Sequence, residues 1–129
     1  MTRTAALALS CLALPATAEP SAPGYYLDAL YAVSTAERLA IFCPDVAFDP
    51  EEASERVARV LERLSQDGIN GDAILALSGV ESGVLERQQA FLARYGLDAP
   101  TDEKVCAAAR AEMAAESAIG AVLVESEEK

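Results

Sequence analysis

Hydrophobic side chains recur with a helical period in the segment that follows the first prolines. Between residues 25 and 42, Leu27, Leu30 and Ile41 fall on one side of a helix with 3.6 residues per turn. Pro44 has no amide hydrogen and ends such a pattern, so the chain is expected to leave the helix just before it. We therefore predict a first amphipathic helix over residues 25–42.

The next helix has strong local signals at its start. Asp49 can accept hydrogen bonds from free amides, Pro50 suits the first helical position, and Glu52 stands where a capping box requires an acid. The apolar stripe that follows consists of Ala53, Val57, Val60, Leu61 and Leu64. Because charged residues occupy the other face, we predict an amphipathic helix that begins after Asp49 and ends near Gln66.

A third apolar stripe extends over residues 72–95 and ends at Gly96. Gly79 and Gly83 interrupt this predicted helix, and each costs about 1 kcal/mol relative to alanine in a helix interior. Two interpretations stay open. The G-x-x-x-G spacing favours close approach of another helix, through self-association or a partner, whereas a break between Ser78 and Gly83 would give two shorter helices.

The last predicted helix is rich in alanine. Thr101 or Asp102 is available as its cap, and it is expected to extend to about Val124, before a charged tail at residues 125–129. From Cys106 onward its small side chains indicate a helix that packs closely against others. No segment alternates apolar and polar residues as a strand does, so no sheet is predicted.

Residues 1–18 have the features of a secretory signal peptide. Arg3 is followed by an apolar run over residues 5–14 and then by small residues that suit cleavage after Ala18. The run is shorter than the roughly twenty residues that a spanning helix needs. Cleavage would remove Cys11 and place the mature chain in the periplasm, where thiols oxidise.

Four amphipathic helices joined by short turns predict an all-α domain over residues 25–124, arranged as an up-down-up-down bundle. Residues 19–24 alternate proline with small residues and are expected to form a flexible leader. In this topology the end of the first helix and the start of the last helix lie at the same end. Cys43 and Cys106 occupy these positions, so we predict a disulfide between them.

Acidic residues dominate the composition. The chain has 21 Asp and Glu against 10 Lys and Arg, which gives a net charge of −11, and loss of Arg3 with the signal peptide would change this to −12. Nucleic acids and anionic lipids carry phosphate charges that such a protein repels. Neither is predicted as a partner. No apolar run after residue 18 is long enough for stable membrane insertion.

Arg38 is the one charge that falls inside the apolar stripe of the first helix. A helix rises about 1.5 Å per residue along its axis. Measured along that axis, Arg38 is therefore about 7.5 Å from the cysteine that follows the first helix, and Glu112 is about 9 Å from the cysteine of the last helix. If the disulfide joins the two helix ends, these charges lie at similar depths. We predict an ion pair between Arg38 and Glu112, with Arg110 and Glu37 as substitutes.

The chain has few side chains suited to catalysis or metal binding. It contains no histidine, and its two mature cysteines are expected to be joined, so acid-base chemistry would depend on carboxylates. One turn places Asp67, Asn70 and Asp72 close together, but its glycines do not follow the order of a calcium-binding EF-hand loop. The usual ligands for haem or zinc are missing. We predict no catalytic, cofactor or metal site.

Three motifs resemble those of a known family. They are CPDV at residues 43–46, AFLARYG at residues 90–96, and C-x3-R-x-E-M-x3-S-x-I-G-x2-L at residues 106–123. Together they resemble a family of small secreted alphaproteobacterial proteins of the Rhodobacter type, catalogued as a domain of unknown function. The resemblance spans most of the mature chain and implies a fold and a secreted location, but no activity. The chain departs from the pattern in its charged C-terminal tail.

These observations favour a periplasmic, non-enzymatic helical protein that binds another protein or contributes to an envelope assembly. Self-association into a homo-oligomer is a further alternative. The alternative is a small enzyme or cation-binding protein that uses a cluster of carboxylates between helices. The two hypotheses predict different structures. A binding module would expose an apolar patch, whereas the alternative requires inward-facing acids without basic partners.

Overall fold

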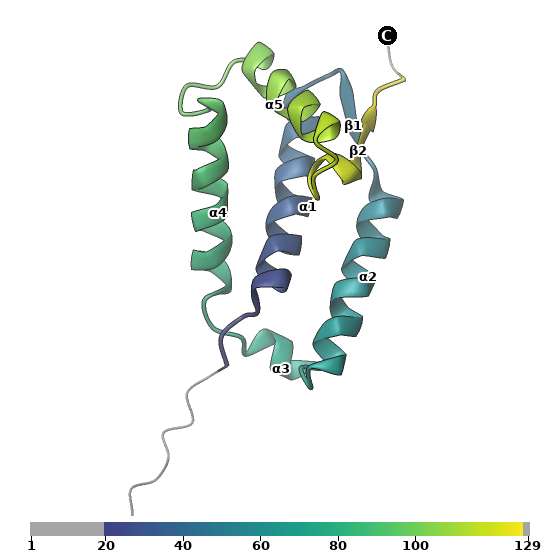
Figure 1. Cartoon of the computed structure of the whole chain (residues 1–129), viewed down its shortest axis with the longest axis vertical. Helices are drawn as coiled ribbons and strands as arrows, with labels where there is room; N and C mark the ends of the chain where they lie inside the picture. Colours follow the sequence, from purple (N-terminus) through teal and green to yellow (C-terminus); the bar gives the residue numbers. More distant parts are fainter. Residues whose placement is uncertain (1–19, 128–129) are drawn as a thin grey trace, which may run out of the picture.

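The computed structural model describes residues 20–127, which are mostly helical with one short sheet. Its helices are α1 (Gly24–Phe42), α2 (Pro50–Gln66), α3 (Asp72–Leu75), α4 (Val80–Tyr95) and α5 (Asp102–Ala114). Helix α1 lies between α2 and α4, these three follow the long axis of the molecule, and α5 crosses over one end (Figure 1). None of the helices in this part of the chain is both long and apolar enough to cross a bilayer. The predicted signal peptide and Cys11 lie outside the described residues.

Small side chains line the contact between α1 and α5. Ala32 and Ala36 of α1 are buried, as are Ala108 and Ala109 of α5. Because the spacing of two packed helices depends on the side chains between them, these methyl groups allow a close approach, as the alanine-rich sequence predicts. Larger side chains fill the rest of the core, including Leu39, Phe91, Leu97, Val105 and Ile119.

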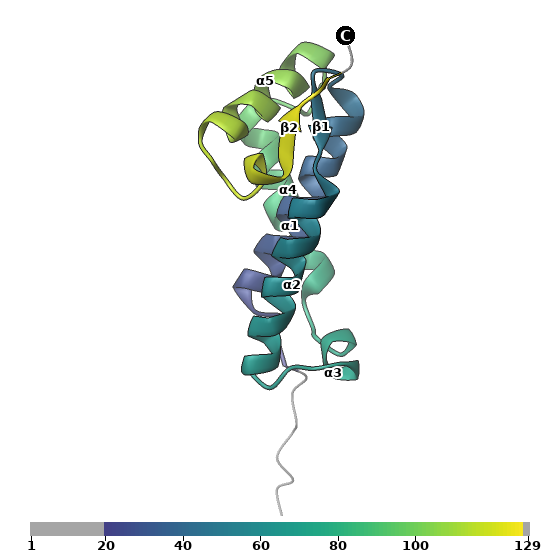
Figure 2. The ribbon, with the colours of Figure 1, turned by 90° about the vertical axis from the view of Figure 1, so that its right-hand side faces the viewer.

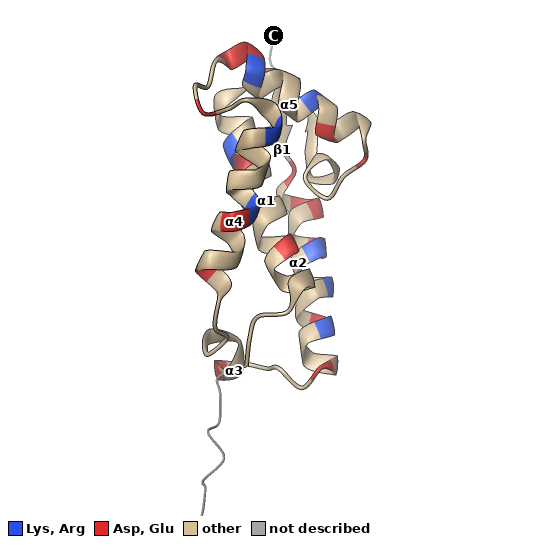
Figure 3. Cartoon of the chain, turned by 60° about the vertical axis from the view of Figure 1, so that its left-hand side comes forward, with Lys and Arg blue, Asp and Glu red and all other residues tan. Residues whose placement is uncertain are grey.

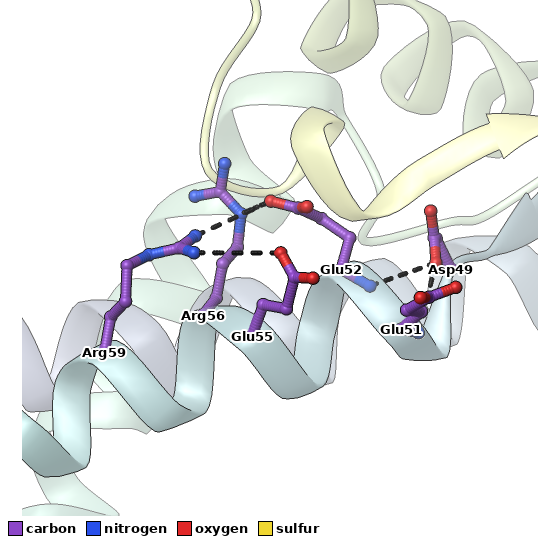
Figure 4. Close-up of polar contacts among 6 residues, drawn as sticks. All are labelled: Asp49, Glu51, Glu52, Glu55, Arg56 and Arg59. Carbon is purple, nitrogen blue, oxygen red and sulfur yellow. Dashed lines mark hydrogen bonds and ion pairs between the residues drawn. The ribbon is translucent and has the colours of Figure 1, made fainter.

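Helix α2 begins at the predicted cap. The Asp49 carboxylate accepts hydrogen bonds from the amides of Glu51 and Glu52, both at 3.1 Å (Figure 4). The reciprocal bond of a capping box is not formed, because the Glu52 carboxylate contacts Arg56 at 2.9 Å instead. The Asp49 amide donates to the Val122 carbonyl at 2.8 Å, which ties the start of α2 to the C-terminal part of the chain.

The helix predicted over residues 72–95 is broken into α3 and α4 at Gly79. This glycine adopts a left-handed conformation with φ +76°, which favours glycine over other residues. Gly83 lies inside α4, where a β-carbon would come within 2.6 Å of the Leu27 side chain. The two glycines therefore have different roles: Gly79 permits the break, and Gly83 permits close contact with α1 of the same chain.

Residues 20–22 pair with the loop between α3 and α4. The Ser78 amide donates to the Pro20 carbonyl at 3.0 Å, and the Ala22 amide donates to the Ser78 carbonyl at 2.9 Å. A segment expected to belong to a flexible leader therefore has defined backbone partners beside the break in the third helix.

Helix α5 ends at Ala114, well before the predicted end at Val124. The Ser117 amide donates to the Glu112 carbonyl at 3.2 Å, and the Glu116 amide donates to the carbonyl three residues earlier at 3.1 Å. These two bonds form a Schellman motif, with Glu116 in the left-handed conformation at φ +52°. Since glycine usually occupies that position, the sequence has no strong signal for this helix end.

After this turn the chain folds back over α5 and forms a strand. Residues Gly120–Val122 form a short 3-10 helix, η1, and Leu123–Glu125 form β2, which pairs antiparallel with β1 (Val46–Phe48) (Figure 2). Ala47 lies opposite Val124 in this pairing. The prediction that the chain has no strand is wrong, because strands of three residues are too short to show clear alternation.

The predicted disulfide is confirmed, but the four-helix bundle used to predict it is not. Cys43 and Cys106 are joined, with their Cα atoms 5.1 Å apart. An up-down-up-down bundle requires the last helix to lie alongside the first, whereas α5 crosses α1 obliquely (Figures 1 and 2). The disulfide therefore links the C-terminal end of α1 to the helix that crosses it.

Candidate functional site

Apolar side chains line one side of α1 without being fully covered. Three adjoining hollows lie there, and Glu37 lines all three. We call this surface the α1 groove. It is lined by Tyr26, Leu30, Val33, Glu37 and Ile41 of α1, Val57 and Leu61 of α2, Phe48 of β1 and Val124 of β2. The α1 groove therefore extends along α1 from its first turn to the sheet.

Helix α2 forms one wall of the α1 groove. Ala53 near its start is only 5 % exposed, whereas Val57 and Leu61 are 39 % and 44 % exposed. These two side chains border hollows of about 200 and 420 Å³. The apolar stripe predicted for this helix is thus only partly buried, since no described element covers its middle.

The sheet end of the α1 groove is wider. Ile41 is 73 % exposed and Val124 is 42 % exposed, and with Phe48 they border a hollow of about 1070 Å³ between α1 and the sheet. Single exposed apolar residues are common, but a contiguous set is typical of surfaces that bind other molecules.

Unpaired acidic side chains accompany the α1 groove. Glu37 lies at the junction of the three hollows and forms no ion pair with any described residue, and Glu125 and Glu127 line the sheet end. The arginines of α2 are distributed differently. Arg56 and Arg59 line a fourth hollow, which adjoins the α1 groove through Val57, and both arginines contact acids of their own helix (Figures 3 and 4). The groove therefore combines apolar side chains with negative charge.

Sequence reasoning did not identify the α1 groove, because it assigned Ile41, Val57 and Leu61 to buried stripes. A usable signal is present at the end of the first helix. Ile41 and Phe42 are consecutive apolar residues, and consecutive helical side chains point about 100° apart. Both cannot face the same neighbour, and the structure leaves both exposed. Phe48 had no assigned role in the sequence prediction.

Glu112 is a buried acid, only 4 % exposed. Its Oε1 accepts a hydrogen bond from the Tyr95 hydroxyl at 2.9 Å and lies 3.7 Å from Nη1 of Arg94. The predicted ion pair with Arg38 is wrong, because Arg38 is exposed and contacts no acid among the described residues. The oblique crossing of α5 removes the matched depth on which that prediction depended, and Glu112 faces α4.

Two groups of side chains that could hold a metal ion have other contacts. The sulfurs of the two cysteines and a carboxylate oxygen of Asp45 lie within 4.8 Å of one another. The sulfurs are joined in the disulfide, however, and Asp45 pairs with Arg110, which was the predicted substitute partner for Glu112. In the turn considered for calcium, Asp67 accepts a hydrogen bond from the Tyr25 hydroxyl at 2.6 Å. These contacts join separate parts of the fold.

Replacing Tyr95 by phenylalanine should lower the free energy of unfolding at pH 7 by about 1 to 2 kcal/mol, because the buried Glu112 carboxylate loses a donor. Burial, and then the hydrogen bond to Glu112, raise the pKa of Tyr95 above its ordinary value. This contribution is therefore present below about pH 10 and is lost as the pH rises through the folded-state pKa. Urea denaturation at pH 7 and above pH 10 measures both effects.

Tyr26→Phe is the matched control for this change, since the Tyr26 hydroxyl has no partner among the described residues. It should leave the free energy of unfolding nearly unchanged. Equal losses in the Tyr26 and Tyr95 variants would show that the bond to Glu112 contributes nothing.

A comparison with known protein families finds a match over residues 23–124. The matching range contains both cysteines of the disulfide, the five α-helices of the described residues and almost all of the sheet. Searches of curated proteins and of solved structures found no match. Because this match covers most of the chain, the protein belongs to the family of unknown function DUF5333.

Proposed function

We propose that this protein is a periplasmic, non-enzymatic binding module that holds a segment of another protein in the α1 groove. The observation that carries the proposal is the set of exposed apolar side chains from α1, α2 and the sheet around Glu37. Amphipathic helices bind grooves of this kind through their apolar face. The segment that fits is an amphipathic helix with a lysine or arginine opposite Glu37.

The charge of the chain supports a basic partner. The net charge is −11, and Glu37 forms no ion pair with any described residue. A positively charged segment would gain an ion pair and faster association. A second copy would instead bring the same acidic surface against the first, so self-association fits the charge less well than a different protein.

Three features support a periplasmic location. Residues 1–18 have the pattern of a signal peptide, and the motifs resemble secreted alphaproteobacterial proteins. The Cys43–Cys106 disulfide agrees with an oxidising compartment. A binding module in this compartment would contribute to an envelope assembly by holding one of its members.

The carboxylate-cluster alternative has less support. It requires inward-facing acids without basic partners, but the buried Glu112 is already contacted by Arg94 and Tyr95. Its carboxylate is thus held by neighbouring side chains and not presented to a substrate or cation.

Replacing Ile41 by aspartate in the tagged mature protein should weaken capture of the periplasmic partner at least about tenfold, because a charge replaces an apolar contact. At 73 % exposure this side chain contributes little to the fold. Glu37→Lys should weaken capture similarly by repelling a basic segment. Affinity purification from periplasmic extract, followed by mass spectrometry, measures the captured protein.

Leu75→Asp is the matched control, because Leu75 is 86 % exposed on α3 and does not line the α1 groove. This variant should capture the partner as well as the natural sequence does. Equal capture by the Ile41 and Leu75 variants would contradict the proposal. Sedimentation tests the other occupant: a dimer that dissociates in Ile41→Asp would place a second copy in the groove and overturn the proposed partner.

A further inference from the structure

A second concave site lies between α1, α4 and the start of α5. It is a cavity of about 300 Å³ that shares no lining residue with the α1 groove. Most of its walls are apolar and are formed by Leu39, Phe42, Phe91, Leu92, Leu97 and Val105. Sites for small molecules typically have such walls, with a few polar groups that orient the bound molecule.

Thr35 contributes a buried polar group to this cavity. It is 6 % exposed, and its Oγ1 has no hydrogen-bond partner among the described residues. A helical threonine often bonds the carbonyl four residues earlier, but the Ser34 hydroxyl donates to that carbonyl, of Tyr31, at 3.2 Å. Buried hydroxyls without a partner are uncommon in folded proteins. The Thr35 hydroxyl therefore has no partner in the free protein, and a bound molecule would reach this buried oxygen by displacing the side chains that cover it.

Arg38 lies beside Thr35 on the same face of α1. Residues three positions apart are neighbours on a helix surface, with about 5 to 6 Å between their β-carbons. Arg38 lines the cavity and forms no ion pair with a described residue, although the chain has 21 acidic side chains. Asp102, at the start of α5, also lines the cavity and is unpaired among these residues. The site thus combines a hydroxyl and a guanidinium from α1 with a carboxylate from α5.

We propose that this cavity binds a small amphipathic monocarboxylate. One oxygen of its carboxylate accepts a hydrogen bond from the Thr35 hydroxyl, and the other accepts from the Arg38 guanidinium. Its hydrocarbon part lies against the apolar walls, where burial favours binding. This site is independent of the α1 groove, because the two share no lining residue.

Titration calorimetry of the mature protein with octanoate tests the proposal. Octanoate should bind saturably with one molecule per chain, and Arg38→Gln should weaken binding about tenfold, because a charge-assisted hydrogen bond is lost. Thr35→Val should weaken binding about fivefold and raise the melting temperature of the free protein, because a buried unpaired hydroxyl is removed. Asp102→Asn should strengthen binding, since it removes a negative charge near the carboxylate.

Octan-1-ol is the matched control ligand, because it keeps the hydrocarbon chain and lacks the charge. It should bind more weakly than octanoate and respond little to Arg38→Gln. Because Arg38 is exposed, this variant is expected to fold even if Thr35→Val repacks the cavity. The proposal is overturned if octanoate does not bind at concentrations up to about 1 mM, if octanol binds equally well, or if Arg38→Gln leaves octanoate binding unchanged.

Discussion

Mature protein in which Cys43 and Cys106 are both replaced by alanine should lose about 3 kcal/mol of its free energy of unfolding. The disulfide joins residues 63 positions apart, and restriction of the unfolded chain by such a loop gives about 4 kcal/mol, of which experiments often recover less. Typical domains have only about 5 to 15 kcal/mol in total. Urea denaturation of the oxidised protein and the variant measures the difference.

A reductant separates the crosslink from the packing of the two side chains. Cys43 is 0 % and Cys106 is 8 % exposed, so alanine at both positions also removes buried sulfur atoms. Reduced protein of natural sequence should lose most of the stability that the variant loses, and the variant should not respond to reductant. If oxidised and reduced protein unfold at the same urea concentration, the disulfide does not stabilise the fold.

The ends of several helices could be predicted because capping depends on residues close together in the sequence. Asp49 caps α2 with its carboxylate, and the Thr101 hydroxyl accepts from the Lys104 amide at 3.2 Å at the start of α5. Gly96 follows α4 in the left-handed conformation, with φ +62°. Each of these signals lies within four residues of the group that it satisfies.

Other boundaries depend on contacts between distant residues. The break at Gly79 adjoins Ser78, whose backbone pairs with Pro20, far away in the sequence. At the end of α5, Glu116 takes a conformation in which glycine is expected. The two strands form because the chain folds back over α5, and neither has a pattern of its own. The mostly helical character is therefore confirmed, whereas the strands and the packing arrangement depend on contacts that the sequence pattern does not reveal.

The candidate site was harder to predict than the helices, because exposure depends on what covers a side chain. Leu64 and Leu61 belong to the same apolar stripe of α2, yet Leu64 is fully buried and Leu61 is 44 % exposed. Periodicity predicts which residues share a face, but not where a neighbouring element ends. Arg38 is a misplaced charge in the apolar stripe of the first helix, and in the structure it lines a cavity and does not pair with Glu112.

Replacing Gly120 by alanine should lower the free energy of unfolding by about 3 kcal/mol or more. A β-carbon at this position would lie 2.1 Å from the Glu112 carbonyl oxygen and 2.7 Å from the Met113 Cα. Both are backbone atoms of α5, so they cannot rotate away as a flexible side chain can. Relief would require η1 to move off α5. Thermal denaturation should show a melting temperature lower by roughly 10 to 20 °C.

Gly24→Ala is the matched control for Gly120→Ala. Its new β-carbon would meet Nη2 of Arg87 at 4.0 Å, which is ordinary contact, and alanine is the better helix former by up to about 1 kcal/mol. The control should therefore melt at or slightly above the natural temperature. If Gly120→Ala does the same, η1 does not pack on α5 as described. If only Gly120→Ala melts early, the contact between η1 and α5 stabilises the fold. Because β2 begins directly after η1, this contact also positions Val124 at the sheet end of the α1 groove.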